Sequence, residues 1–560
     1  MNAAIIFGLL LALMLTGMPI SISLGLTVLT FLFTMTQVPL ESVALKLFTG
    51  IEKFEIMAIP FFILAGNFLT HGGVAKRMIN FATALVGHWH GGLGLAGVMA
   101  CALFAAVSGS SPATVVAIGA ILLPAMVKAG FPNRFGAGII TTSGALGILI
   151  PPSIVMVMYS VATNTSVGAL FMAGVIPGLV MAFMLGLTTW WRARQAHYPH
   201  VKIFPERSGG QATVASLFGV FYAVVFTVVP PFVLGNLLAR VLPNPGFGYF
   251  LAGVFWLALA PWTTRNKWMT RFVYIGLIVV GFPVAASLLL LEWLGSGFGT
   301  AQLSLIPTVV TLGWISLIQS CGKYTGIAPT FKFELLWESL SVWRAYWESI
   351  WGLLLIVVVM GGIYTGLFTP TEAAAMSAVY AFIVAVFVYK DMKLADVPKV
   401  LLASANMSAM LLYIITNAVM FSFIMTNEQI PQALAQWMLD MGMGPLVFLL
   451  AVNVLLLLAG NFMEPSSIVL IFAPLLFPVA TRLGIDPVHF GIIMVVNMEV
   501  GMCHPPVGLN LYVASGITKM GITELTVAVW PWLLTMLGFL VMVTYWPPLS
   551  LWLPRLLGMS

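Results

Sequence analysis

The stretch GILIPPSIVMVMYS at residues 147–160 places two consecutive prolines inside an apolar run. A double proline removes two backbone hydrogen-bond donors and breaks a helix. A second apolar run, 492–517, is interrupted in the same way at Pro505-Pro506. Within lipid, such a break is tolerated only where protein or water satisfies the freed carbonyl groups. The sequence therefore predicts two broken membrane helices, at 139–163 and 492–517.

The rest of the chain is also apolar. Hydrophobic residues make up 61% of the 560 residues and charged residues 7%, against about 45–50% and about 25% in soluble domains. This composition excludes a soluble enzyme and a disordered chain. The Lys and Arg residues behind the net charge of +6 are scattered, which excludes a nucleic-acid binder. Because several runs reach the roughly 20 apolar residues that cross a membrane, we expect an all-α, multi-pass membrane protein.

Two pairs of shorter apolar runs surround clusters of polar residues. The first pair, within 92–127, consists of two 16-residue runs, about 24 Å of helix each, on either side of Ser108-Gly-Ser-Ser-Pro112. The second pair, within 445–480, lies on either side of Asn461–Ser467. Each pair predicts a helical hairpin that enters the membrane and turns back.

The hairpins and broken helices repeat at a fixed spacing. A shift of 354 residues brings Gly147 onto Gly501 and Pro151-Pro152 onto Pro505-Pro506, with hairpin and broken helix in the same order. The chain therefore contains two copies of one unit. The expected domains are a first repeat (1–194), an inserted membrane segment of about four spans (195–330), an amphipathic helix in the membrane interface (331–349) and a second repeat (350–560).

Basic residues indicate that the two copies are inverted. The basic pair Lys76-Arg77 corresponds to 428–444, which has no Lys or Arg. The loop 36–45, which also has no Lys or Arg, corresponds to 390–399, which has three. Since basic loops gather on the cytoplasmic side, the paired loops lie on opposite sides of the membrane. An inverted repeat is typical of secondary transporters.

The polar residues of the first copy suit a hard cation. No Asp or Glu occurs from Ile56 to Pro205, and at the first hairpin Ser108, Ser110 and Ser111 offer hydroxyls beside unpaired carbonyls. Unwound backbone of this kind coordinates Na⁺ in transporters. The missing carboxylates also remove repulsion against an anionic substrate, at which short helices would aim their positive ends.

The second copy is more ionisable. It contains Glu464 in its hairpin, and Glu499 and His504 on either side of its break. Proton coupling therefore stays an open alternative there. Neither copy contains a motif of a metalloprotease, a serine hydrolase or a P-loop ATPase. We therefore do not expect an enzyme.

Six stretches together resemble a known transporter family, the large membrane subunit of tripartite ATP-independent periplasmic (TRAP) transporters, C4-dicarboxylate branch. They are EKFEIMAIPFFILAGNFL (52–69), AAVSGSSPATVVAIG (105–119), GILIPPSIVMVMYS (147–160), GGIYTGLFTPTEAAA (361–375), GNFMEPSS (460–467) and NMEVGMCHPPVGLNLYVASGI (497–517). The resemblance covers about three quarters of the chain and leaves out 195–330.

The resemblance implies an elevator-type secondary transporter in a bacterial inner membrane, and we place its N-terminus on the periplasmic side. It also implies two protein partners, which are a small four-helix membrane subunit and a soluble periplasmic solute-binding protein. Uptake of an organic acid would be coupled to Na⁺, with no other cofactor. C4-dicarboxylates such as succinate are the default substrate, and related organic acids are alternatives.

The resemblance further implies where the ligands bind, because the family's Na⁺ sites lie where a hairpin tip meets a broken helix. One set of residues is Ser108, Ser111, Gly144, Gly147 and Pro151. The other set is Asn461, Glu464, Pro465, Gly501 and Pro505. From position alone, the substrate is expected between the two tips, near Ser110, Thr142, Ser466, Asn497 and Asn510.

Three other functions are weighed beside this one. A stand-alone Na⁺/organic anion symporter would need no soluble partner. A membrane scaffold that only assembles partners would not transport at all. An intramembrane enzyme is the most distant, for want of catalytic groups.

Overall fold

The computed structural model describes most of the two repeats. The described residues are 2–16, 18, 20–35, 41, 45, 48, 52–198, 333–442, 444–461, 463–505 and 508–559. The four spans expected within 195–330 therefore lie outside the described residues, apart from the first four positions of that segment.

The described residues form helices and no strand. In the first half the helices are α1 (Asn2–Leu15), α2 (Ile20–Met35), η1 (Phe54–Met57), α4 (Ala58–His71), α5 (Val74–Val86), α6 (Gly92–Ser108), α7 (Ser111–Lys128), α8 (Asn133–Gly144), η2 (Ala145–Ile148), α9 (Ile154–Thr163) and α10 (Val167–Gln195).

In the second half they are α17 (Phe333–Tyr364), α18 (Pro370–Ile383), η4 (Val384–Val388), η5 (Leu394–Asp396), α19 (Val397–Asn427), α20 (Ile430–Asp440), α21 (Pro445–Gly460), α22 (Pro465–Arg482), α23 (Pro487–Cys503), α24 (Leu509–Thr518), α25 (Ile522–Tyr545) and α26 (Pro548–Leu556).

The chain divides into two compact units. The first unit contains Met1–Ala82, His90–Val201 and Trp351–Ser560. The second contains Thr83–Trp89 and Lys202–Ile350, of which 83–89 and 333–350 are described. The expected interfacial helix at 331–349 belongs to α17, which continues without a break to Tyr364. All sites discussed below lie in the first unit.

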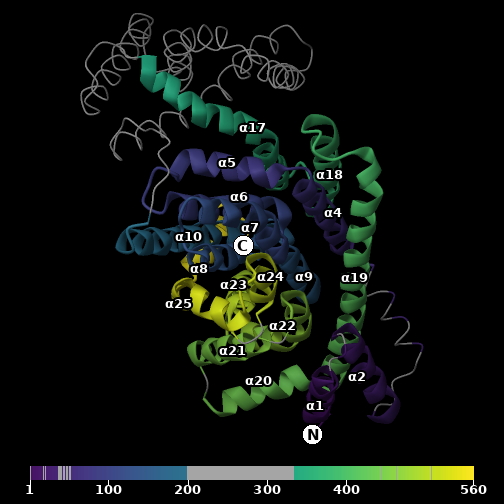
Figure 1. Cartoon of the computed structure of the whole chain (residues 1–560). Coiled ribbons are helices and arrows are strands. Elements are labelled where there is room, and N and C mark those ends of the chain that lie inside the picture. Colours follow the sequence, from purple (N-terminus) through teal and green to yellow (C-terminus); the bar gives the residue numbers. More distant parts are fainter. Residues whose placement is uncertain are drawn as a thin grey trace, which may run out of the picture. The chain divides into compact units, whose positions relative to one another are not determined.

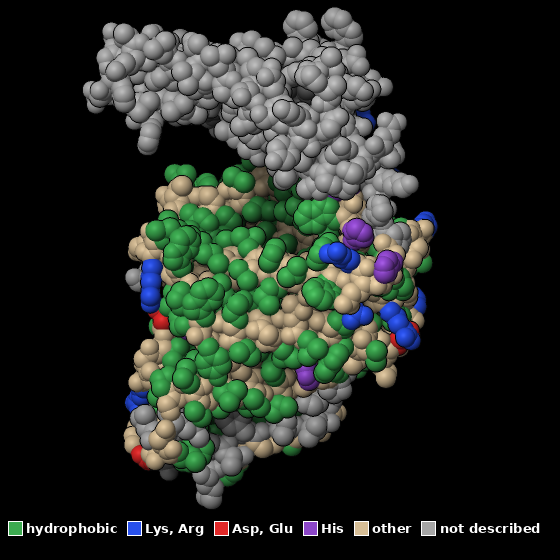
Figure 2. All heavy atoms as spheres, turned by 90° about the vertical axis from the view of Figure 1, so that its left-hand side faces the viewer, with side chains coloured by type: hydrophobic (Ala, Val, Ile, Leu, Met, Phe, Trp, Pro, Cys, Tyr) green, Lys and Arg blue, Asp and Glu red, His purple; other side chains and the backbone are tan. Residues whose placement is uncertain are grey.

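Eight helices of the described ranges are long and apolar enough to cross a membrane, which confirms a multi-pass membrane protein. They include α7 and α22, whose apolar runs look too short in the sequence. Each is 18 residues long, because the helix starts at the polar cluster and ends at a basic residue, Lys128 or Arg482. On the face drawn in Figure 2, hydrophobic and uncharged side chains cover most of the described surface, as expected for contact with lipid.

Both broken helices are interrupted at the predicted prolines. The first, α8–η2–α9, stops at Ile148 and restarts at Ile154. Ser153 accepts from the Met156 amide and donates to the Ile148 carbonyl, so one hydroxyl bridges the break. The second, α23–α24, stops at Cys503.

The broken helices start earlier than the apolar runs indicate. They begin at Asn133 and Pro487. Asp486 caps α23 by accepting from the Val488 and His489 amides. This cap extends α23 beyond its apolar part, whereas α8 begins after Pro132 without a side-chain cap.

The two repeats match helix by helix. Helices α7 and α22 correspond at a spacing of 354 residues at both ends, and α8 and α23 begin 354 residues apart. Their packing is reciprocal as well: α7 contacts α24 and α22 contacts α9, while α8 contacts α25 and α23 contacts α10.

Two groups of helices matter for the site. We call the hairpin helices α6, α7, α21 and α22 and the broken helices α8, α9, α23 and α24 the core. We call α2, α4, α18 and α19 the frame. Within the frame, α4 lies beside α18 and α19 (Figure 1), and α2 packs on α19. Asn67 of α4 donates to Ser404 of α19 at 2.8 Å.

Candidate functional site

The tip of the first hairpin is a tight polar turn. Gly109 has a φ of 61°, in the left-handed region that glycine adopts without strain. The Ser110 carbonyl accepts from the Thr114 hydroxyl at 2.9 Å, and the Ser108 and Thr114 hydroxyl oxygens lie 2.9 Å apart. Several oxygens therefore gather at the start of α7.

This tip lies directly against the first broken helix. A Cβ atom on Gly147 would lie 2.6 Å from the Ser110 carbonyl oxygen and 2.8 Å from the Ser111 Cα. A Cβ on Gly109 would lie 2.7 Å from the carbonyl oxygen of Pro152. Only glycine fits at both positions, because the neighbouring atoms belong to the backbone.

The structure thus brings together the residues expected at the first cation site. Ser108 and Ser111 begin and end the turn, and Gly147 contacts it. Gly144 lies one turn before Gly147 and packs against Val115 of α7. Pro151 lies in the break, next to the proline whose carbonyl faces Gly109.

Asn510 of the second repeat also reaches the first tip. Its amide nitrogen donates to the Ser111 hydroxyl at 2.7 Å and to the Thr141 carbonyl at 3.4 Å. The Cys503 thiol donates to the same Thr141 carbonyl at 3.4 Å. Asn510, which is expected near the substrate, is therefore hydrogen-bonded to Ser111, which is expected at the first cation site.

Sequence reasoning missed Thr114, Thr141 and Cys503 at this place. Thr114 follows the Ser cluster by one helical turn, a spacing that could have found it. Cys503 stands in an apolar run, and no local signal pairs it with Thr141, which lies 362 positions earlier. Only the packing of the two broken helices brings these groups together.

The second tip repeats the close approach with different side chains. A Cβ on Gly460 would lie 3.0 Å from the Gly501 Cα, so the end of α21 touches α23 backbone to backbone. Asn461 accepts a hydrogen bond at Oδ1 from His504 Nδ1, 2.9 Å away, when that nitrogen carries the proton. Asn461, Gly501 and His504, which directly precedes Pro505, are therefore neighbours.

The other residues of the second set lie within the hairpin. The Ser467 hydroxyl donates to Glu464 Oε1 at 3.2 Å. Pro465 is the first residue of α22, and Ser466 follows it in the buried first turn. Glu464 and Pro465 thus lie at the tip.

Two residues expected near the substrate point elsewhere. The Thr142 hydroxyl donates to the Gly138 carbonyl of its own helix at 2.8 Å. The Asn497 amide donates to Asn453 Oδ1 at 2.8 Å, and Asn453 in turn donates to Thr544. Asn453 lies two turns before the tip of α21. The structure therefore does not bring Thr142 or Asn497 to the hairpin tips.

Glu499 is fully buried, and neither of its carboxylate oxygens has a hydrogen-bond partner among the described residues. It precedes Cys503 by one turn of α23 and so shares the helix face that meets the first repeat. Asn497 and Gly501 lie on another face, toward α21.

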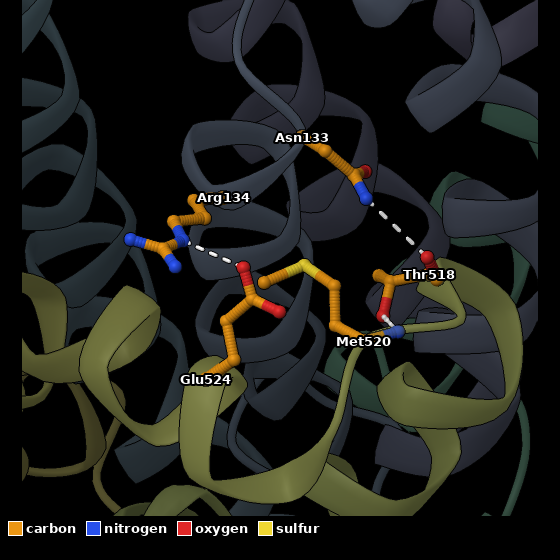
Figure 3. A network of polar contacts seen from close by, with 5 residues as sticks. All are labelled: Asn133, Arg134, Thr518, Met520 and Glu524. Atoms are coloured by element: carbon orange, nitrogen blue, oxygen red, sulfur yellow. Dashed lines mark hydrogen bonds and ion pairs between the residues drawn. The ribbon is translucent and has the colours of Figure 1, made fainter.

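Polar bonds also join the outer ends of the two broken helices. Figure 3 shows Arg134 donating to Glu524 at 2.7 Å and Asn133 donating to the Thr518 carbonyl at 3.3 Å. These bonds connect the start of α8 with the junction of α24 and α25. A reciprocal bond joins the second half of the first broken helix to the start of the second. The Tyr159 hydroxyl of α9 donates to the carbonyl of Pro487, the first residue of α23, at 2.8 Å.

The donor set at the tips fits a hard monovalent cation. Hydroxyl and carbonyl oxygens predominate, and the described ranges contain no group of three or more His, Cys, Asp or Glu residues that could hold a metal ion. Soft transition metals prefer thiolate and imidazole ligands.

These observations define a class, the polytopic helical membrane proteins with paired hairpins and broken helices. Residues 7–280 and 303–549 match the family described as tripartite ATP-independent periplasmic transporter, DctM component, so this chain belongs to that family. The family consists of transporter permease subunits, which confirms the expected family and the expectation that the chain is not an enzyme. The match also extends into 195–330, a segment that the six similar stretches leave out. The similarity to the family therefore covers more of the chain than those stretches indicate.

Individual relatives agree with the family. The chain is 60% identical over 573 residues to the C4-dicarboxylate TRAP transporter large permease protein DctM of Rhodobacter capsulatus, and 100% of each chain is covered. It is 42% identical to the protein of the same name from Pseudomonas aeruginosa, with 96% and 95% covered. It is 32% identical to the isethionate TRAP transporter permease protein DctMQ of Oleidesulfovibrio alaskensis, with 98% of this chain and 65% of that protein covered.

Proposed function

We propose that this chain is the large permease subunit of a Na⁺-driven transporter that takes up C4-dicarboxylates or related organic acids. The observation that carries the Na⁺ coupling is the first hairpin tip, where hydroxyl and carbonyl oxygens meet a broken helix in a region with no Asp or Glu. Such oxygens on unwound backbone are the ligands that transporters use for Na⁺. We assign the two cation sites to the two sets of tip residues given above.

The substrate class is supported by charge and by the relatives. Helices α7 and α22 both begin at a tip, and their N-terminal amides favour an anion. The relatives at 60% and 42% identity are named for C4-dicarboxylates, and another is named for isethionate. Ser110, Ser466 and Asn510 are the residues that we assign to the anion, because they lie at the tips or bond to one.

Transport would proceed by movement of the core relative to the frame. A bare carboxylate in hydrocarbon is too costly to cross alone, so it would travel with the domain that binds it. The reciprocal packing supports a two-fold relation between the two halves, and the distribution of Lys and Arg among the loops supports the inverted form of that relation. Na⁺ binding at Ser111 would order the tip that Asn510 holds.

Two partners are part of the proposal. A small four-helix membrane subunit would assemble with this chain in a bacterial inner membrane, with the N-terminus of this chain on the periplasmic side. A periplasmic solute-binding protein would deliver the substrate. The name DctMQ of one relative supports a close association of permease components.

Uptake of labelled succinate into proteoliposomes tests the proposal. The vesicles contain this chain and the small subunit, with the solute-binding protein present or absent and a gradient of Na⁺ or K⁺. We expect uptake only with Na⁺ and the soluble protein together. Uptake without the soluble protein would favour a stand-alone symporter, and no uptake of any organic acid would favour a scaffold.

A further inference from the structure

Lys53 lies before the frame helix α4, and its side chain binds the end of the core helix α9. It lies directly before η1, which leads into α4. Its ammonium group donates to the Val161 carbonyl at 2.5 Å and to Asn164 Oδ1 at 2.7 Å. Both acceptors belong to the C-terminal end of α9, where Asn164 is the left-handed C-cap residue.

The chemistry of this contact is favourable. The last carbonyls of a helix have no partner within the helix, and the helix dipole makes this end negative. A lysine ammonium therefore satisfies an unpaired carbonyl and interacts well with the dipole. Burial of about half of the group lowers the pKa of Lys53, and Glu55 opposes this shift.

Lys53 is anchored to the frame. The carbonyl of Phe54, the next residue, accepts from the Thr371 hydroxyl of α18 at 3.4 Å. Helix α4 packs along α18 and α19. Helix α9 packs mainly against α22 of the second hairpin, and it also touches η1 and α4. The two bonds of Lys53 therefore cross from frame to core.

A second contact between α4 and the core has a different character. A Cβ on Gly66 would lie 3.1 Å from the Ser108 carbonyl oxygen at the first hairpin tip. It is one point in the packing of α4 against α6, and it involves no directional side-chain bond. The Lys53 bonds are directional and fix one relative position.

We propose that Lys53 is a reversible latch that holds the core against the frame in the arrangement described here and opens in each transport cycle. The proposal rests on the proposed function, in which the core moves past the frame. The two hydrogen bonds add to the packing of α19 on α22 and of α4 on α6. They bias one position and are weak enough to be exchanged for water.

A pair of cysteines tests the latch. In a background with Cys321→Ser, Lys53→Cys and Asn164→Cys are introduced together, and the protein is reconstituted with its partners. A reducible bis-methanethiosulfonate cross-linker about 10 Å long joins the two thiols, because a direct disulfide does not span the length of a lysine side chain. Cross-linking should reduce succinate uptake about tenfold or more, and reduction should restore it, because a closed latch blocks a required movement. The matched control is Asn133→Cys with Thr518→Cys, which joins two parts of the core (Figure 3) and should leave uptake unchanged.

A second measurement does not depend on transport. Spin labels on α18 and α22 report the distance between frame and core. Lys53→Met should shift the distance distribution away from the arrangement of the unsubstituted protein, and Lys53→Arg should preserve it.

The outcomes separate the two proposals. Full uptake by the protein cross-linked between positions 53 and 164, or an unchanged distance distribution in Lys53→Met, overturns the latch and leaves Lys53 as a cap of α9. If the unsubstituted protein shows no Na⁺-driven uptake, the proposed function fails, and the distance distribution still decides on the latch.

Discussion

At the scale of single residues, Asn510 makes the contact that matters most. Its amide joins the Ser111 hydroxyl and the Thr141 carbonyl, both of the first repeat. Sequence patterns placed Ser111 and Gly147 correctly at one tip, because serine, glycine and proline mark turns and breaks locally. They could not foresee that Asn510 bonds to Ser111, because the two residues are 399 positions apart and only packing joins them.

Replacement of Asn510 by Ala should weaken the first cation site. The change leaves the Ser111 hydroxyl without its anchor and costs about 1–3 kcal/mol in stability, as for other unpaired buried groups. We expect a higher half-saturating Na⁺ concentration for uptake.

The control for this prediction is Asn133→Ala, which removes an amide bond at the outer end of α8. It should leave the Na⁺ dependence of uptake as it is. An Asn510→Ala protein with an unaltered Na⁺ dependence would contradict the role given to Asn510.

At the scale of elements, the sequence predicted a polar turn between two helices in both hairpins, and it predicted both breaks, but it underestimated helix lengths. The apolar run stops before Arg482, whereas α22 continues to that residue. Thr142 was expected near the substrate from position alone, and its hydroxyl bonds to the preceding turn of its own helix, a common choice for threonine in helices. The helix expected at 331–349 continues in α17 across 349 to Tyr364.

The contact between α21 and α23 yields a prediction about glycine. A Cβ on Gly501 would lie 3.1 Å from the Gly460 Cα, where only backbone could move. Gly501→Ala should therefore destabilise the protein by about 1–3 kcal/mol and reduce uptake. Thermal unfolding in detergent measures the first effect.

Gly516 of α24 is the matched control. No atom lies within 4 Å of a Cβ built there, so Gly516→Ala should stabilise the helix by about 0.5–1 kcal/mol. Equal melting temperatures for Gly501→Ala and Gly516→Ala would refute the close packing of the second tip.

At the scale of the whole molecule, the membrane topology depends on which loops lie on the same side of the membrane. Arg77 forms an ion pair with Asp391 and stacks on Tyr389. The two loops that the positive-inside rule assigns to the cytoplasm are therefore in contact. From this point α19 runs for 31 residues, about 46 Å, toward Gln429.

Cysteine labelling tests the topology. With Cys321→Ser as background, single cysteines at Lys393 and at Gln429 should react with a membrane-impermeant maleimide from opposite sides of the membrane. We expect Lys393→Cys to react from the cytoplasmic side. Labelling of both positions from one side would contradict the inverted arrangement.

The central claim is that Na⁺ bound at the hairpin tips drives uptake. Its most direct test is the initial rate of succinate uptake as a function of Na⁺ concentration, in the unsubstituted protein and in Ser111→Ala. We predict a sigmoidal dependence in the former and, in the latter, a half-saturating Na⁺ concentration raised about tenfold, the loss of about 1.4 kcal/mol of binding free energy. A rate that is the same in Na⁺ and K⁺, or a Ser111→Ala curve that superimposes on the unsubstituted one, would contradict the account.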